Sequence, residues 1–141
     1  MPDDPSVDDQ LINAVNARDL AAATRLFGPR ATYVCPGGVA EGREEIGSYF
    51  AIYYDAFADL TVTAHEKSAC GDLVTLEWTL TGTHTGPLLL PGGDLAAPTG
   101  RRIAVRGCHV RTMDAGMIAT LRVYYDQLEL LTQLGISCLP V

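Results

Sequence analysis

Few side chains in this sequence are suited to moving protons, and the two that stand out lie in its last third. Asp126 follows a run of strand-forming residues and stands directly before Gln127, while His109 lies in the preceding run of the same kind. A carboxylate in an apolar pocket has a raised pKa, because desolvation disfavours its charged form, and it can then exchange a proton near neutral pH. Asp126 is therefore the first candidate for an acid/base residue. His109 is the second, as a group that could orient Asp126 or share its proton.

Both residues also have ordinary structural interpretations. An Asp directly before a helix is often its N-cap, and Asp126 stands at such a point. A single His within a strand is commonly a hydrogen-bonded interior or rim residue, so the role of His109 stays open as well. The other two histidines are expected to be structural, with His84 at a strand end and His65 exposed on an early strand.

Aromatic side chains supply surfaces on which a planar ligand could stack. Tyr33, Phe50, Tyr53 and Trp78 are the candidates for substrate binding. Aromatic rings give broad apolar contacts, and the hydroxyls of Tyr33 and Tyr53 could bond a substrate carbonyl. Aromatic residues at helical spacing are also frequent in a core, so the assignment depends on which of these rings face a pocket.

The composition excludes several classes of function. Asp and Glu number 17 against 10 Lys and Arg, which gives a formal net charge of -7. Without a basic stripe the chain cannot grip phosphates, so we expect no nucleic-acid partner and no membrane surface. The N-terminal stretch is acidic and polar, unlike a secretory signal, and a cytoplasmic location is expected.

No metal or organic cofactor is expected. The four cysteines, at positions 35, 70, 108 and 138, are far apart and lack CxxC spacing, so they are predicted to be buried free thiols rather than zinc ligands. The glycine pairs Gly37-Gly38 and Gly92-Gly93 precede no helix with the spacing of a phosphate-binding loop and are predicted to be turns.

Helical spacing of apolar residues dominates the first half of the chain. Helices are predicted over residues 6–17, over a short segment after the N-cap Asp19, and over residues 43–57. Gly28 and Pro29 are expected to end the second helix, and a short strand is expected at residues 31–35. A terminal helix is predicted over residues 127–134, with Gly135 after its last turn.

The second half of the chain is rich in strand-forming residues. Strands are predicted over residues 60–69, 73–84, 101–113 and 117–125, with an exposed loop at residues 88–97 that could cover a pocket. Helices followed by strands in hairpin order indicate an α+β fold with an antiparallel sheet curled over the helices. No linker or repeat divides the chain, so residues 1–141 are expected to form one domain.

Three segments resemble the SnoaL-like polyketide cyclases. They are Leu80-Thr-Gly-Thr-His-Thr-Gly-Pro87, Pro98-Thr-Gly-Arg-Arg-Ile103 and Tyr125-Asp-Gln-Leu-Glu-Leu-Leu-Thr-Gln-Leu-Gly135. These cyclases share the cone-shaped α+β barrel of nuclear transport factor 2 and ketosteroid isomerase. The resemblance implies a curved sheet with helices on its concave side, a deep and mostly apolar pocket, and a homodimer.

The same resemblance implies a function. Its members include cofactor-free enzymes of secondary metabolism, such as antibiotic biosynthesis, that close rings in polyketide-like carbonyl substrates by an intramolecular aldol reaction. The acid/base Asp of these cyclases corresponds to Asp126, and a His that often faces the same pocket corresponds to His109. An aldol closure needs a base for an acidic C–H proton and a donor for the new alkoxide, which a tuned carboxyl could provide.

Two other functions remain open. Related barrels open epoxides or hydroxylate their substrates, and the epoxide reaction normally needs a wider Asp/Arg/Asp network. Arg106 and Arg122 are expected on a solvated face, and no second interior Asp is evident. A non-catalytic ligand-binding or dimerisation module is the third possibility, because this barrel often serves as one.

Overall fold

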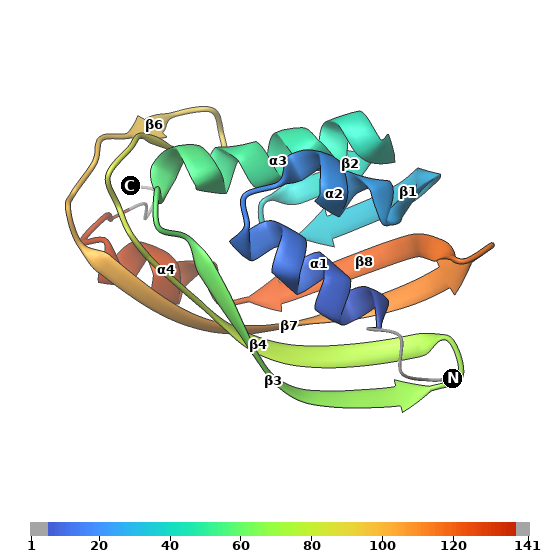
Figure 1. The fold of residues 1–141 in the computed structure, drawn as a ribbon. Coiled ribbons are helices and arrows are strands. Elements are labelled where there is room, and N and C mark those ends of the chain that lie inside the picture. The colour runs from blue at the N-terminus through green and yellow to red at the C-terminus, as the bar shows by residue number, and fades with distance from the viewer. Residues whose placement is uncertain (1–5, 138–141) are drawn as a thin grey trace.

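A computed structural model describes residues 6–137 as helices packed against one side of a curved, six-stranded sheet (Figure 1). The strand order is β2-β1-β8-β7-β4-β3, and neighbouring strands are antiparallel except for the parallel pair β1 and β8. Strands β5 and β6 form a separate small hairpin. The elements are α1 (Val7–Asn16), α2 (Leu20–Arg25), β1 (Phe27–Cys35), β2 (Gly38–Glu41), α3 (Gly42–Ala56), β3 (Thr61–Cys70), β4 (Leu73–Thr83), β5 (Leu88–Leu89), β6 (Leu95–Ala96), β7 (Arg102–Asp114), β8 (Met117–Tyr125) and α4 (Gln127–Gln133).

The four predicted helices are confirmed, and their ends have the expected chemistry. The Ser6 side chain accepts a hydrogen bond from the backbone N–H of Asp9, which caps α1, and Asp19 caps α2 in the same way. Gly135, just beyond α4, has a φ of 72°, the left-handed conformation that glycine adopts without strain at the end of a helix. Local sequence chemistry therefore determines where α1 and α2 begin and where α4 ends, while α3 begins without a side-chain cap at Glu41.

The four long strands are also confirmed, while the region between α2 and α3 differs from prediction. Strand β1 already begins at Phe27 and includes Gly28 and Pro29. These two residues were expected to end the second helix and to precede the strand. Pairing of β1 with β8 is interrupted between Phe27 and Thr32, so Pro29 can lie in the strand without breaking a ladder hydrogen bond. The short β2, which pairs with the end of β1, was not predicted. The predicted loop at residues 88–97 contains the β5–β6 hairpin.

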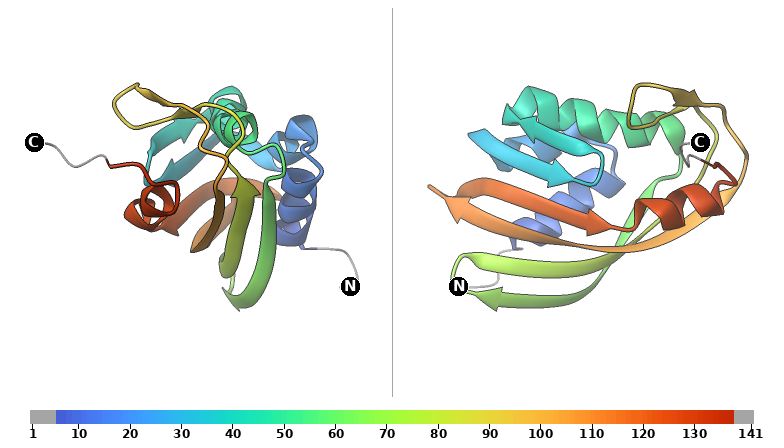
Figure 2. Two further views of the ribbon diagram at one scale, coloured as in Figure 1. Left: turned by 90° about the vertical axis from the view of Figure 1, so that its left-hand side faces the viewer. Right: turned by 180° about the vertical axis from the view of Figure 1, so that it is seen from behind.

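The core lies between the helices and the concave side of the sheet, as the two views of Figure 2 show. One cluster joins α1, α2 and α3 to β1, β4 and β8 through residues such as Leu11, Ile46 and Leu121. A second cluster joins the end of α3 to β7 and α4 through residues such as Phe57 and Val105. This arrangement confirms the predicted α+β fold of the nuclear transport factor 2 type. The inward-facing side chains of the sheet therefore face α1 and α3.

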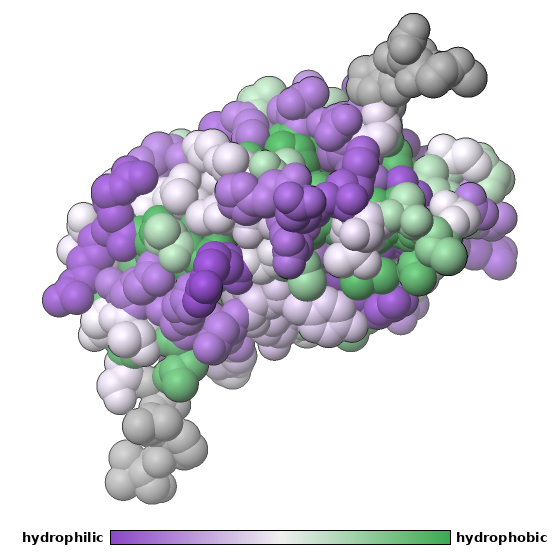
Figure 3. All heavy atoms as spheres, turned by 90° about the horizontal axis from the view of Figure 1, so that it is seen from below, coloured by the Kyte–Doolittle hydropathy of each residue, from purple (hydrophilic) through white to green (hydrophobic). Residues whose placement is uncertain are grey.

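The outer side of the sheet carries a mixture of polar and apolar side chains (Figure 3). Arg106, on β7, is exposed there, as predicted. Among the cysteines, Cys35 is buried and Cys108 is half-buried, but Cys70 is exposed at the end of the edge strand β3, so the prediction of a buried thiol is wrong for Cys70. Cys138 lies outside the described residues. None of the helices within residues 6–137 is long and apolar enough to cross a membrane.

Candidate functional site

A cavity of about 100 Å³ lies between the helices and the sheet. Its walls come from α1, the second half of α3 and the inward-facing residues of β1, β3, β4, β7 and β8. Almost all of the lining side chains are aliphatic or aromatic, and among the described lining residues His109 alone can carry a charge near neutral pH. The cavity therefore suits an uncharged, largely apolar compound with a few hydrogen-bonding groups.

Five of the six residues predicted for the site line this cavity. They are Tyr33, Phe50, Tyr53, Trp78 and His109. The rings of Tyr33 and Phe50 meet edge to face, with their centroids 5.5 Å apart, so β1 and α3 hold each other's aromatic side chains in place. The structure brings these residues to one cavity, while their contact with a substrate remains a prediction.

The position of Trp78 depends on a glycine in the neighbouring strand. Gly107 is the partner of Trp78 in the β4–β7 pairing, and a Cβ at Gly107 would lie 2.5 Å from the indole ring and 2.9 Å from the carbonyl oxygen of Tyr124. Such distances are too short for a side chain. The missing side chain therefore lets the Trp78 ring lie flat over β7 and form part of the cavity wall.

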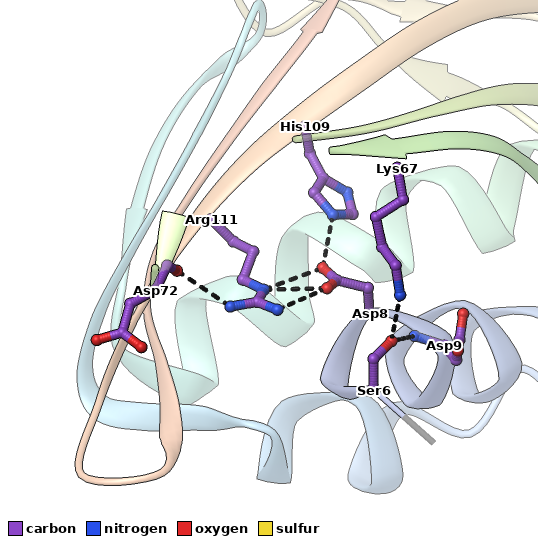
Figure 4. Close-up of polar contacts among 7 residues, drawn as sticks. All are labelled: Ser6, Asp8, Asp9, Lys67, Asp72, His109 and Arg111. Atoms are coloured by element: carbon purple, nitrogen blue, oxygen red, sulfur yellow. Dashed lines mark hydrogen bonds and ion pairs between the residues drawn. The ribbon is translucent and has the colours of Figure 1, made fainter. Parts of the chain in front are cut away.

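His109 is hydrogen-bonded to Asp8, which forms a buried ion pair with Arg111 (Figure 4). Its Nε2 lies 3.1 Å from Oδ1 of Asp8, in the first turn of α1. The Arg111 guanidinium, two residues further along β7, donates to Asp8 from Nε at 3.2 and 3.1 Å and from a terminal nitrogen at 2.8 Å. Arg111 also donates to the carbonyl oxygen of Asp72 at 3.1 Å. Asp8, His109 and Arg111 are all buried.

These contacts determine which nitrogen of His109 carries the proton. Burial alone would raise the pKa of Asp8, but hydrogen bonds from His109 and Arg111 and the charge of Arg111 lower it to about 2. Asp8 is thus a carboxylate near neutral pH and can only accept hydrogen bonds, so Nε2 of His109 must be protonated. The lone pair of a neutral imidazole is then on Nδ1, which has no hydrogen-bond partner within residues 6–137. In that tautomer Nδ1 is the nitrogen that can accept a proton.

A pair of phenols provides the other polar part of the cavity wall. The hydroxyls of Tyr53, from α3, and Tyr125, from the end of β8, form a short hydrogen bond with each other. Burial raises the pKa of Tyr53 to about 12, although its hydrogen bond with Tyr125 acts in the opposite direction. Burial raises the pKa of Tyr125 still more strongly, and the neighbouring Tyr53 adds to that rise. Both hydroxyls therefore stay protonated and can donate to an oxygen atom on a ligand. The nearby Tyr54 hydroxyl is instead used in a hydrogen bond to the carbonyl of Val15.

Asp126 is the sixth predicted residue, and the structure corrects its placement. Its side chain is exposed, is not part of the cavity wall, and accepts hydrogen bonds from the backbone N–H groups of Leu128 at 2.9 Å and Glu129 at 3.2 Å. These bonds make Asp126 the N-cap of α4. The physical reason is geometric, because a side chain that turns to cap the next helix cannot also point into the cavity.

Sequence reasoning missed Asp8 and Arg111. Asp8 belongs to the acidic N-terminal stretch but is completely buried, and Arg111 rather than Arg106 or Arg122 is the interior arginine. A signal was present in the alternation of β7, where Ile103 and Val105 face the core at the same parity as His109 and Arg111. A buried arginine requires a buried acid, so this parity predicts an acidic partner for Arg111 inside the fold.

The remaining histidines lie away from the cavity. His65 is exposed on β3, and its Nε2 is 2.7 Å from the hydroxyl of Thr79. His84 is buried, stacks on Phe57 and accepts a hydrogen bond from the backbone N–H of Thr99 at 3.1 Å. Their structural interpretation agrees with the sequence-based expectation. Within residues 6–137 no three His, Cys, Asp or Glu side chains gather as a metal site would require.

The sequence of this chain matches a known protein family. The model of the SnoaL-like domain family matches residues 9–121. The chain belongs to this family. No curated protein sequence matches it. The elements that build the cavity of this SnoaL-like protein therefore lie almost entirely within the matched segment, while Tyr125 and α4 follow it.

Solved structures share the fold over most of the chain. A candidate SnoaL-like polyketide cyclase from Jannaschia sp. CCS1 is 22% identical, with a TM-score of 0.81 over 94% of this chain and 91% of that one. IdmH, a candidate polyketide cyclase from Streptomyces antibioticus, is 26% identical, with a TM-score of 0.76 over 92% and 96% of the two chains. AclR, a candidate hydroxylase from Streptomyces galilaeus, is 22% identical, with a TM-score of 0.78 over 92% of each chain.

Proposed function

We propose that this SnoaL-like protein is a cofactor-free acid/base enzyme that cyclises a small, uncharged, polyketide-like carbonyl compound. The proposal rests on the position of His109. Its side chain lines an apolar cavity, and its Nε2 is hydrogen-bonded to the buried carboxylate of Asp8. An imidazole with one nitrogen held in this way offers its other nitrogen to the cavity as a base. The candidate cyclases among the similar structures support the reaction class.

The proposed reaction uses both polar parts of the cavity wall. Nδ1 of His109 removes a proton from the carbon beside a substrate carbonyl, and the electron pair of that C–H bond moves to the carbonyl oxygen to form an enolate. A hydrogen bond from the Tyr125 hydroxyl stabilises the developing negative charge. The enolate carbon then attacks a second carbonyl of the same molecule, which forms the new C–C bond. The imidazolium returns its proton to the resulting alkoxide, so the enzyme is regenerated and no atom is lost.

Asp8 and Arg111 act through His109 rather than on the substrate. Neither residue lines the cavity. Asp8 fixes the tautomer and orientation of the imidazole and stabilises the imidazolium that forms during the reaction. Arg111 keeps Asp8 ionised within the buried cluster. Both are therefore positioning residues.

The proposal is tested with an enolisable ketone, because the natural substrate need not be known. Acetophenone is incubated with the protein in D2O, and incorporation of deuterium into its methyl group is followed by NMR. Replacing His109 by Gln keeps a side chain that can bond Asp8 but removes the base, so we expect exchange to slow by about 100-fold or more. His65→Gln is the matched control, since His65 is exposed and remote from the cavity. Equal exchange rates in His109→Gln and the unaltered protein would refute the proposed role.

A second reaction deserves a test because AclR, one of the similar structures, is a candidate hydroxylase. The same imidazole could instead remove a proton from a water molecule, whose oxygen then attacks an epoxide carbon while the ring C–O bond breaks. The imidazolium protonates the released alkoxide, so no oxidant is needed. Products formed in ¹⁸O-labelled water distinguish the two reactions, since water addition introduces the label into a new C–O bond and ring closure does not. Binding of carbonyl compounds without any exchange or turnover would indicate the third possibility, a ligand-binding module.

The expectations of a homodimer and of a cytoplasmic location both stay predictions. The outer side of the sheet is the surface on which two copies could meet (Figure 3), and Tyr124 of β8 is 52% exposed. Light scattering coupled to size-exclusion chromatography checks the predicted dimer, with a mass of one chain as the contrary result.

A further inference from the structure

A second, smaller cavity of about 70 Å³ shares a wall with the first. Tyr53 of α3 lines both cavities. The other residues that line the second cavity do not line the first. They are Gly37 at the β1–β2 turn, Tyr49 and Ile52 of α3, residues 89–91 of the β5–β6 hairpin, and Gln127 at the start of α4. The two cavities are thus neighbours, with Tyr53 between their walls.

The second cavity has a more polar wall than the first. No charged side chain is present among its described lining residues, and the amide of Gln127 and the phenols of Tyr49 and Tyr53 are its polar side-chain groups. Leu89 lines this cavity and is also 42% exposed, so the hairpin forms its outer rim. The hairpin is closed by two backbone hydrogen bonds between Leu90 and residues 93 and 94, at 3.0 and 2.8 Å. An occupant would therefore be uncharged, and it could combine apolar contacts with a hydrogen bond to one of these polar groups.

The hydrogen bond that holds Tyr53 is one that a substrate can replace. The Tyr53 hydroxyl is bonded to the hydroxyl of Tyr125, and that bond lies where the proposed reaction places the substrate oxygen. When Tyr125 is the donor in this pair, a substrate oxygen that accepts its hydrogen bond takes the place of the Tyr53 hydroxyl. Binding of a substrate therefore weakens the contact that keeps Tyr53 between the two cavities.

We propose that the second cavity is a subsite for the distal, apolar part of the same substrate, and that Tyr53 is the movable partition between the two. This inference rests on the proposed function, because it takes the carbonyl end of the substrate to lie beside His109. It names the substrate class more closely, as an uncharged aryl ketone with an apolar extension. A compound that fills the first cavity alone would leave the second one unused.

The test is a series of acetophenones with para-alkyl chains of increasing length, from methyl to octyl, whose dissociation constants are measured by calorimetry. If the chain enters the second cavity, affinity rises by about fourfold for each CH2 that is transferred from water. Replacing Gly37 by Val adds bulk beside Tyr49, because a Cβ at Gly37 would lie 3.6 Å from that ring, an ordinary contact. We expect the ratio of long-chain to short-chain affinity to fall at least tenfold in Gly37→Val.

Two further variants keep the test independent of one substitution. Leu89→Ala enlarges the second cavity at its exposed rim, so the longest chain that still gains affinity should become longer. Leu95→Ala is the matched control, since Leu95 belongs to the same hairpin but is 65% exposed and lines neither cavity. Its ratio of affinities should equal that of the unaltered protein.

The possible outcomes separate this inference from the proposed function. A plateau of affinity at the same chain length in the unaltered protein, Gly37→Val and Leu89→Ala would overturn the second subsite. Binding that depends on chain length as expected, but without deuterium exchange, would support the subsite and contradict the acid/base function. If deuterium exchange depends on His109 but the affinity does not change with the length of the alkyl chain, the acid/base function is supported and the second subsite is contradicted.

Discussion

Replacing Asp8 by Asn tests the buried cluster on which the site depends. The amide has the shape of the carboxylate but no charge, so Arg111 would remain buried without its counter-ion. Removing one partner of a buried ion pair costs about 3–5 kcal/mol of unfolding free energy. Asn can still accept one hydrogen bond, so we expect a loss near the lower end of that range. Asp9→Asn is the matched control, because Asp9 lies in the same helical turn and is exposed.

The pH dependence of this loss is the sharper test, because its sign follows from the lowered pKa. The folded-state pKa of Asp8 is about 2, below its ordinary value of 3.8. As the pH falls, the unfolded chain takes up the proton first, so the stability that Asp8 contributes is complete above about pH 5 and is lost as the pH approaches 2. The full difference corresponds to about 2 kcal/mol. About half of it, or about 1 kcal/mol, is lost by about pH 3.

Urea unfolding followed by circular dichroism measures both effects. The difference in unfolding free energy between the unaltered protein and Asp8→Asn should be about 1 kcal/mol smaller at about pH 3 than at about pH 6. Other carboxylates titrate in both proteins and cancel in this difference. A difference that does not change with pH would show that the Asp8 carboxylate is not held by His109 and Arg111 in solution, and the reasoning about the tautomer of His109 would fail with it.

Three further substitutions test separate parts of the structure. Asp126→Ala should lower the unfolding free energy by about 1 kcal/mol in urea titrations through loss of the α4 cap, and should leave deuterium exchange into acetophenone unchanged. Gly107→Ala should cost about 1–3 kcal/mol in the same titrations, because the new Cβ would collide with the ring of Trp78. Tyr125→Phe removes one of the two phenol donors and should slow the exchange by about 100-fold, measured by NMR.

Much of the fold could be predicted because its elements follow local rules. The strands of the second half alternate and are separated by turns, such as the one at Gly71, where φ is 62°. The errors arose where tertiary contacts decide. Pro29 lies in a strand because that part of β1 is not paired with β8, and β2 is only four residues long and depends on its pairing with β1.

The site was harder to predict than the fold, because its parts come from distant segments. The resemblance pointed to His109, and the alternation of buried residues along β7 is consistent with its inward position. Trp78 on β4 and Tyr33 on β1 lie at inward positions of their own strands. Asp8 lies 101 positions before His109, and no local pattern shows which turn of α1 meets β7. For Asp126 the resemblance implied an acid/base residue, whereas its position before a helix indicated an N-cap. The hydrogen bonds that it accepts from Leu128 and Glu129 favour the N-cap.

The helix that brings Asp8 to His109 also closes the cavity, and the period of an α-helix links the two. Leu11, Ile12 and Val15 follow Asp8 by three, four and seven positions, which places all four side chains on one side of α1. The ion pair with Arg111 therefore fixes not only the tautomer of His109 but also the apolar wall that keeps water away from it. A substitution that releases Asp8 would admit water beside the base as well as disorient it. The effect of Asp8→Asn on deuterium exchange should thus exceed what a changed orientation of the imidazole alone would cause.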